Sequence, residues 1–127
     1  MALAGIRAPF ANFEGAELDT VRLGEARLTM ANFSDARLKA VDFSRADLSR
    51  TVLTGMQATG CTFAGARLEY ADLSKATLNG SLWTGADLSG ANLHAIVDQG
   101  SEWGGALLNG VRRTDVDLYE AENFKPS

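Results

Sequence analysis

Residues 31–50 read ANFSD ARLKA VDFSR ADLSR, four groups of five residues that are built alike. Each group begins with Ala or Val and has Phe or Leu in its third place. The pattern extends in both directions: when the chain is cut in fives from Met1, 20 of the 25 third places hold Leu, Phe or Trp. The first places are mostly Ala, and the frame does not slip between Phe13 and Leu93. The repeat unit of the chain is therefore a pentad.

A period of five fits neither of the two regular structures. An α-helix needs an apolar stripe that returns near every 3.6 residues, and a flat strand needs a period of two. The pattern instead requires a backbone that turns a corner every five residues. Within a pentad, the first and third side chains point to the same side, as in a short extended segment. We expect these two positions to face a core, and the second, fourth and fifth positions to face water.

Several pentads resemble the consensus of the pentapeptide-repeat family, Ala-(Asp/Asn)-Leu-x-x. The close matches are Ala11-Asn12-Phe13, Ala31-Asn32-Phe33, Ala46-Asp47-Leu48, Ala71-Asp72-Leu73, Ala86-Asp87-Leu88 and Ala91-Asn92-Leu93. The resemblance implies an all-β fold, a right-handed quadrilateral β-helix with four pentads in each coil. The 25 pentads then give 25/4, or about six coils, and a rod roughly 30 Å long at the usual strand spacing.

A chain of 127 residues fits a single domain. We expect regular coils over about 1–110 and an irregular C-terminal cap over about 111–127. Asp98 and Arg113 stand at third positions, where unpaired charges are unfavourable, and therefore predict a bulge or interruption near that end. The tail from Thr114 fits either a short capping helix, with Thr114 as N-cap and Asp117 as a weaker capping box, or further coil.

Residues 20 apart lie above one another if a coil has 20 residues. One inner column then gathers the aromatic side chains, and we expect it to be a packed ladder; an aromatic cage for a ligand is the alternative. A second column consists of leucines. The core residues predicted in this way are Phe43, Phe63, Trp83, Trp103, Leu28, Leu48, Leu68 and Leu88.

The outward second positions alternate in charge along the rod. Arg27, Asp47, Arg67 and Asp87 are spaced by 20 residues, and Glu17 and Arg37 begin another such column. We expect ion pairs between coils here, each worth roughly 0–1 kcal/mol because the groups are exposed. Their expected role is to maintain register and solubility.

Catalytic chemistry is not indicated by any cluster of residues. His94, the one histidine, is expected to point outward with too few neighbours to bind a metal. Cys61 occupies a first position and is expected to be a buried small hydrophobe rather than a nucleophile. We therefore expect no enzyme activity, no cofactor and no metal.

The bulk properties limit the compartment and the partners. The net charge of −4 argues against direct binding to nucleic-acid backbones. Met1–Phe10 does not resemble a secretory signal, and no apolar run approaches the ~18 residues of a membrane span. A lone cysteine fits a reducing compartment. We expect a cytoplasmic bacterial protein that does not contact membranes.

The first functional hypothesis is a binding or scaffolding module that recognises another protein. Its candidate surface is the corner formed by the fifth positions Phe10, Met30, Arg50 and Tyr70, because fifth positions elsewhere are mostly Gly or polar. An N-terminal cap that covers Phe10 is the alternative. The oligomeric state stays open, with a dimer through one end of the coil as an option.

A second hypothesis follows from the family resemblance, since some pentapeptide-repeat proteins mimic DNA and protect DNA gyrase or related topoisomerases. The corresponding acidic surface would comprise Asp72, Asp87 and Asp117. Residues 1–67 carry eight basic and seven acidic residues, whereas residues 68–127 carry four and nine, so only the second half is acidic.

A third hypothesis is weaker. The ending from Ala91 through Gly110 to Tyr119 resembles the repeat ends of some bacterial type VI secretion-associated proteins, which implies an adaptor or scaffold role.

Overall fold

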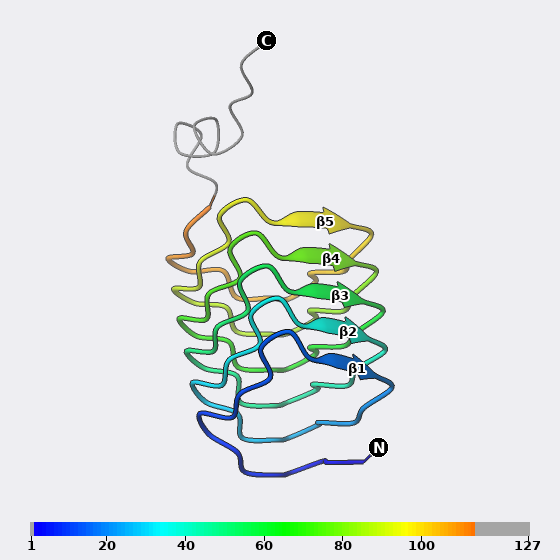
Figure 1. The fold of residues 1–127 in the computed structure, drawn as a ribbon. Helices are drawn as coiled ribbons and strands as arrows, with labels where there is room; N and C mark the ends of the chain where they lie inside the picture. Colours follow the sequence, from blue (N-terminus) through cyan, green and yellow to red (C-terminus); the bar gives the residue numbers. More distant parts are fainter. Residues whose placement is uncertain (1, 114–127) are drawn as a thin grey trace.

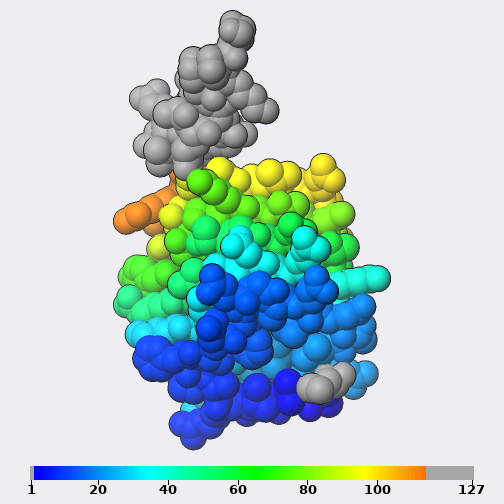
Figure 2. Space-filling view, in the orientation of Figure 1, coloured from blue at the N-terminus to red at the C-terminus, as the bar shows by residue number. Residues whose placement is uncertain are grey.

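The computed structural model describes residues 2–113, and over this range the chain is a four-sided parallel β-helix (Figure 1). One side of each coil carries a strand of three residues, and the strands are β1 (Glu17–Asp19), β2 (Arg37–Lys39), β3 (Gln57–Thr59), β4 (Thr77–Asn79) and β5 (Val97–Gln99). They form one parallel sheet in chain order, and each residue pairs with the residue 20 positions further on. The coils are stacked in sequence order from one end of the molecule to the other (Figure 2).

The other three sides keep the same register. They are joined by isolated parallel bridges that run from Ala2↔Arg22 to Asn92↔Arg112. We number the sides by their pentads: side 1 begins at residues 1 and 21, side 2 at 6 and 26, side 3 at 11 and 31, and side 4, with the strands, at 16 and 36. The four-pentad coil is thus confirmed. The five strands and the bridges beyond them make five coils and part of a sixth, slightly fewer than expected; the tail from Thr114 lies outside the described residues.

The corners are made by the fifth residue of each pentad. From Gly5 to Gly110, eleven glycines and eleven other residues occupy these places, and all have φ between 51° and 73°. This left-handed conformation is free for glycine but costs an L-residue roughly 1 kcal/mol or more. A corner every five residues is what turns the extended pentads into a closed square coil.

Backbone hydrogen bonds join each pentad to both neighbouring coils, as residues 41–45 illustrate. The N–H groups of Phe43 and Arg45 donate to the next coil at 2.8 and 2.9 Å, and that of Asp42 donates to the preceding coil at 3.0 Å. The Ala46 N–H closes the corner by donating to the Phe43 carbonyl at 3.0 Å, the bond of a type II turn with positive φ at its third residue.

The fourth residue of the pentad has an N–H that is satisfied by a side chain instead. The Ser44 N–H donates to Asp42 Oδ1 at 2.8 Å, and the Ser44 hydroxyl donates to the same oxygen at 2.5 Å. This Asx turn explains why Asp or Asn occurs at second positions, since it satisfies the fourth-residue N–H, which makes no hydrogen bond between coils. The same backbone bond is accepted by Asn12, Asn32, Asp47, Asp72, Asp87 and Asn92.

The aromatic column is a packed ladder, as expected. Phe43 and Phe63 stack with ring centroids 5.1 Å apart, Phe63 and Trp83 at 4.0 Å, and Trp83 and Trp103 at 4.9 Å. The rings contact one another face to face, so the cage alternative is wrong for this column. The leucine column is fully buried as well, with no exposed surface on Leu28, Leu48, Leu68 or Leu88.

The two charged third positions lie at the C-terminal end of the described coils. The expected bulge near Asp98 is wrong, because Asp98 pairs in register with Leu78. Asp98 is exposed at the edge of the sheet, and its Oδ2 accepts a hydrogen bond from Trp103 Nε1 at 2.6 Å. Arg113 is exposed too, and both residues line a cavity of about 280 Å³ at this end. Their charges are therefore accommodated outside the closed part of the core.

We predict that Leu68→Asp unfolds the protein, because the substitution places a charge without a partner in a fully buried site. Glu69→Ala is the matched control in the next residue. It removes an exposed ion pair with Arg67 at 3.4 Å, worth at most about 1 kcal/mol. Thermal unfolding followed by circular dichroism measures both variants, and similar melting temperatures would contradict the five-residue frame.

We predict different fluorescence from the two tryptophans. Trp83 is fully buried, whereas Trp103, also predicted as a core residue, is half-buried because it lies at the end of the ladder. The variant Trp103→Phe should keep a blue-shifted emission that iodide quenches poorly, and Trp83→Phe should leave an emission that iodide quenches more. Equal quenching of the two variants would contradict this placement.

Candidate protein-binding surface

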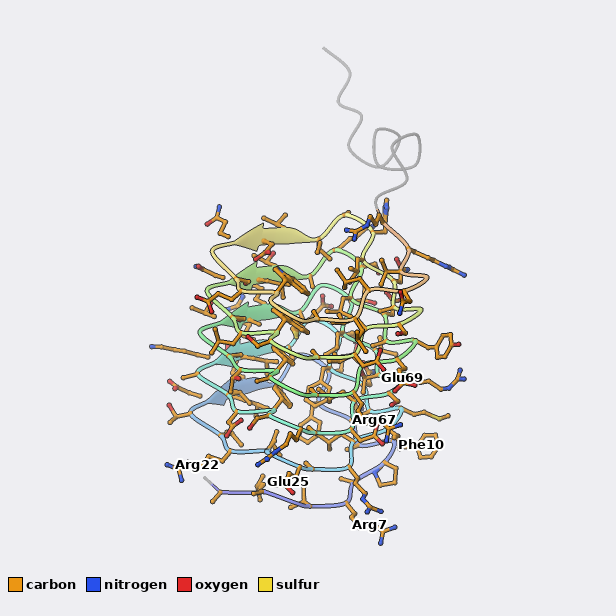
Figure 3. All side chains as sticks on the ribbon, turned by 180° about the vertical axis from the view of Figure 1, so that it is seen from behind. Arg7, Phe10, Arg22, Glu25, Arg67 and Glu69 are labelled. Atoms are coloured by element: carbon orange, nitrogen blue, oxygen red, sulfur yellow. The ribbon has the colours of Figure 1, made fainter. Side chains whose placement is uncertain are left out.

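The structure brings the four residues of the predicted partner surface into one column. Phe10, Met30, Arg50 and Tyr70 lie at the corner between sides 2 and 3 in four successive coils, and we call them the corner strip. Phe10 is 72% exposed, Met30 46% and Tyr70 60%. Phe10 projects away from the coil at this edge (Figure 3). The alternative in which an N-terminal cap covers Phe10 is wrong for the described residues.

The other three corners lack large apolar side chains within residues 2–113. Their fifth positions hold glycine, alanine, threonine or charged residues: Gly5, Glu25, Arg45, Gly65, Gly85 and Gly105; Gly15, Asp35, Gly55, Lys75 and Ala95; and Thr20, Ala40, Gly60, Gly80 and Gly100. Large exposed apolar residues also occur at second positions, at Val52, Leu82, Val97 and Leu107. The corner strip is distinguished by having three in one column; its positive-φ backbone is shared with the other corners.

Tyr70 is held between its neighbours in the column. The Arg50 guanidinium carbon lies 4.8 Å from the centroid of the Tyr70 ring, a cation–π contact worth about 0.5–1 kcal/mol at an exposed site. One coil further on, Gly90 lies under the ring: a Cβ atom there would come within 2.6 Å of Tyr70 Cε1. This contact was not predicted from the sequence, although the 20-residue spacing between Tyr70 and Gly90 is a signal for it.

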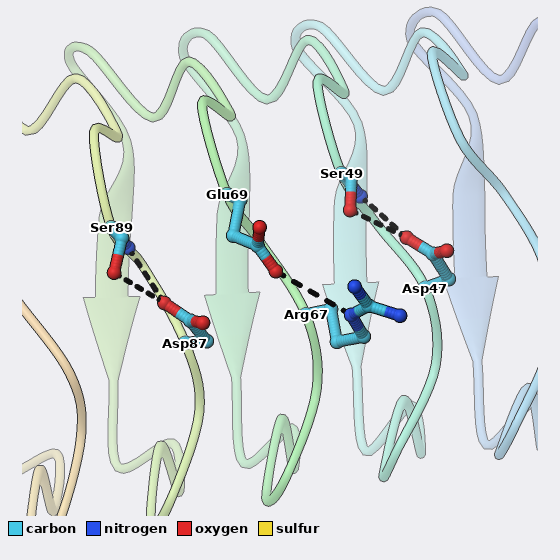
Figure 4. Close-up of polar contacts among 6 residues, drawn as sticks. All are labelled: Asp47, Ser49, Arg67, Glu69, Asp87 and Ser89. Atoms are coloured by element: carbon cyan, nitrogen blue, oxygen red, sulfur yellow. Dashed lines mark hydrogen bonds and ion pairs between the residues drawn. The ribbon is translucent and has the colours of Figure 1, made fainter.

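Side 2, next to the corner strip, carries the charged column. Arg67 donates to Glu69 of its own pentad at 3.4 Å (Figure 4). Asp47 and Asp87 instead accept hydrogen bonds from the serines two residues after them (Figure 4). The expected ion pair between Glu17 and Arg37 is confirmed at 3.8 Å on side 4. Pairing across coils therefore occurs there, whereas on side 2 the bonds are made within each pentad.

The residues of the alternative acidic surface do not form one column. Asp72 is on side 3 and Asp87 on side 2, and both are half-buried. Asp117 lies outside the described residues. Hydrogen bonds from the Ser89 hydroxyl at 2.6 Å and from its N–H hold the pKa of Asp87 below its usual range, with a smaller contribution from Arg67. The carboxylates of Asp72 and Asp87 therefore satisfy backbone N–H groups within their own pentads.

Two further side chains, Cys61 and His94, are of types that can react or bind metals. Cys61 is fully buried, as expected, and burial raises the pKa of its thiol. His94 is 8% exposed and therefore buried, although its fourth position in the pentad was expected to face water. Within residues 2–113, no three His, Cys, Asp or Glu side chains are grouped so that they could hold a metal ion.

The comparisons with known proteins agree with this architecture. A family model for pentapeptide repeats matches eight copies over residues 10–45, 42–80 and 66–95. The fold class is a four-sided β-helix built from these pentads. The chain belongs to the pentapeptide-repeat family. No curated protein matches the chain. In the described part, no helix is long and apolar enough to cross a membrane.

Two solved structures illustrate the likeness. One is a pentapeptide repeat protein from the thylakoid lumen of Arabidopsis thaliana, with 25% identity, a TM-score of 0.77, and coverage of 86% of this chain and 77% of that one. The other is a trypsin-treated form of QnrB1, a plasmid-mediated fluoroquinolone resistance protein, with 19% identity, a TM-score of 0.53, and coverage of 99% and 72%. The second shares the fold alone.

We predict that the effect of Ser89→Ala on stability depends on pH. A depressed folded-state pKa stabilises the protein above the ordinary titration range of Asp, and this contribution is lost as pH falls through the folded pKa. The variant should therefore lose about 0.5–1 kcal/mol near pH 7, after allowance for solvent screening, and this loss should shrink as the pH falls below the ordinary titration range of Asp.

Ser74→Ala is the control for this prediction, because there the bond to Asp72 comes from the Ser74 N–H, which the substitution keeps. Denaturant unfolding of both variants at several pH values measures the difference. A pH-independent loss in Ser89→Ala would contradict the proposed role of the hydroxyl.

Proposed function

We propose that this protein is a rigid, non-enzymatic module that binds another protein through the corner strip. The observation that supports the proposal is the column of Phe10, Met30 and Tyr70, which are 72%, 46% and 60% exposed. Buried aromatic and apolar anchors supply most of the energy of a protein interface, whereas charges at its rim mainly tune association.

The backbone at the corner strip strengthens this argument. Phe10, Met30 and Tyr70 have φ of 64°, 60° and 60°, where glycine would be less strained by roughly 1 kcal/mol. An exposed aromatic ring gains no core-packing free energy that would offset this backbone strain. A binding role gives these side chains a benefit that the fold alone does not.

The DNA-mimic hypothesis has weaker support. It needs a continuous acidic surface, but Asp72 and Asp87 lie on different sides and their carboxylates bind their own pentads. QnrB1 is a fluoroquinolone resistance protein, but it is 19% identical to this chain, and we draw no shared role from it. The type VI secretion hypothesis stays a prediction that the neighbouring genes would test.

The proposed compartment is the cytoplasm of a bacterium, in which a single buried thiol stays reduced. The thylakoid-lumen source of the Arabidopsis protein shows that the fold occurs elsewhere. Cell fractionation tests this assignment.

We predict that the double variant Phe10→Ser/Met30→Ser loses most of its capture of the native partner in a pull-down. The matched comparison is the triple variant Asp72→Asn/Asp87→Asn/Asp117→Asn, which removes the alternative acidic surface and should change capture little. A DNA mimic gives the reverse order and a steep fall of binding with salt, so the pull-down is repeated at two ionic strengths. If neither variant changes capture, both surfaces are wrong.

A further inference from the structure

Arg50 is held in a fixed place on the corner strip. Its guanidinium carbon lies 4.8 Å from the centroid of the Tyr70 ring, and the ring in turn rests on the bare backbone of Gly90. The three residues thus form a stack along the rod axis, with one member from each of three successive coils. Such a stack restricts the long Arg side chain before any partner arrives, so less conformational entropy is lost on binding.

The stack leaves the hydrogen-bonding edge of the guanidinium available. A planar guanidinium that packs on a ring keeps its N–H groups in the plane, where they match the two oxygens of a carboxylate. Arg50 is exposed, and within residues 2–113 it has no ion-pair partner. Two apolar side chains lie near it in the repeat: Met30 is one coil before it on the strip, and Val52, 39% exposed, follows on side 3.

The surroundings favour a carboxylate over a more highly charged anion. A cleft of about 260 Å³ beside Tyr70 is lined by Tyr70, Ala71, Asp72, Gly90, Asn92 and Arg112. Asp72 and Arg112 in this cleft carry opposite charges, so the cleft adds no net positive charge for a phosphate dianion, and a single Arg is a poor match for one. A singly charged Asp or Glu with an apolar residue beside it complements both the guanidinium of Arg50 and the apolar side chains of the corner strip.

We propose that Arg50 is a carboxylate-binding fork positioned by Tyr70 and Gly90, and that the partner docks on the corner strip with a peptide segment in which an Asp or Glu adjoins an apolar side chain. This inference rests on the proposed function, since it names the chemistry of the partner at the same surface.

The test uses random dodecapeptides displayed on phage and selected on the intact protein. The enriched peptides should carry Asp or Glu next to Leu, Ile, Phe or a similar residue. As synthetic peptides they should bind Arg50→Lys at least about tenfold more weakly than the original protein, because Lys keeps the charge but lacks the planar fork. Affinities are measured by titration calorimetry.

Two glycine substitutions separate positioning from stability. Gly90 and Gly85 are both fifth positions, with φ of 71° and 69°, so alanine at either place should lower the melting temperature similarly. A Cβ at Gly90 meets the Tyr70 ring, whereas at Gly85 nothing lies within 4 Å. Gly90→Ala should therefore weaken peptide binding about as much as Arg50→Lys, while Gly85→Ala should leave the affinity unchanged.

The outcomes separate this inference from the proposed function. If the enriched peptides lack acidic residues, or bind Arg50→Lys and Gly90→Ala as tightly as the original protein, the carboxylate fork is wrong. In that case loss of binding to Phe10→Ser/Met30→Ser still supports the corner strip as the docking surface. Peptides that are insensitive to every corner variant, or no enrichment at all, would overturn both.

Discussion

The left-handed corner is the constraint on which this structure depends. Every fifth residue from Gly5 to Gly110 has φ between 51° and 73°, and this regularity sets the 20-residue coil. Once the coil has this length, equivalent residues stack, and the inter-coil hydrogen bonds and the core columns follow from the stacking. Any change in the spacing of corners would shift each later side chain out of its column, as a slip of register does in a sheet.

The same constraint explains the polar part of the repeat. The corner removes the fourth N–H from the inter-coil ladder, and an Asp or Asn two residues earlier accepts it, as Asp47 does for Ser49 at 3.1 Å. A backbone donor left unsatisfied would cost about 1–3 kcal/mol where it is buried. Four of the 16 acidic residues, Asp42, Asp47, Asp72 and Asp87, therefore have a local structural role. Net charge alone is consequently a poor guide to a binding surface in this fold.

The pentad pattern predicted a corner every five residues, and the family resemblance supplied the four-pentad coil. Together they placed the buried columns and the corner strip, because each depends on position within a strictly periodic frame. Contacts within and between side chains were harder to predict. The recurring Asp-x-Ser spacing is a sequence signal for the bond between Asp87 and Ser89. The 20-residue spacing from Arg67 equally favoured an ion pair with Asp87, so the sequence did not decide between the two. The Asp98 bond to Trp103 depends on where the regular coil ends, which a uniform repeat does not reveal. The burial of His94 likewise has no counterpart in the five-residue pattern.

The five positions of the pentad have different structural roles, and these roles indicate which residues can vary without disturbing the fold. First and third side chains fill the core, and second-position Asp and Asn satisfy the backbone, so changes there disturb the fold. Fifth residues contribute a backbone conformation to the fold, and their side chains point outward. Glycine meets that requirement with the least strain, as at Gly85 and Gly105. A bulky residue at such a place, as at Phe10 or Tyr70, adds surface that the coil does not need, and this excess is where a partner can be recognised without altering the scaffold.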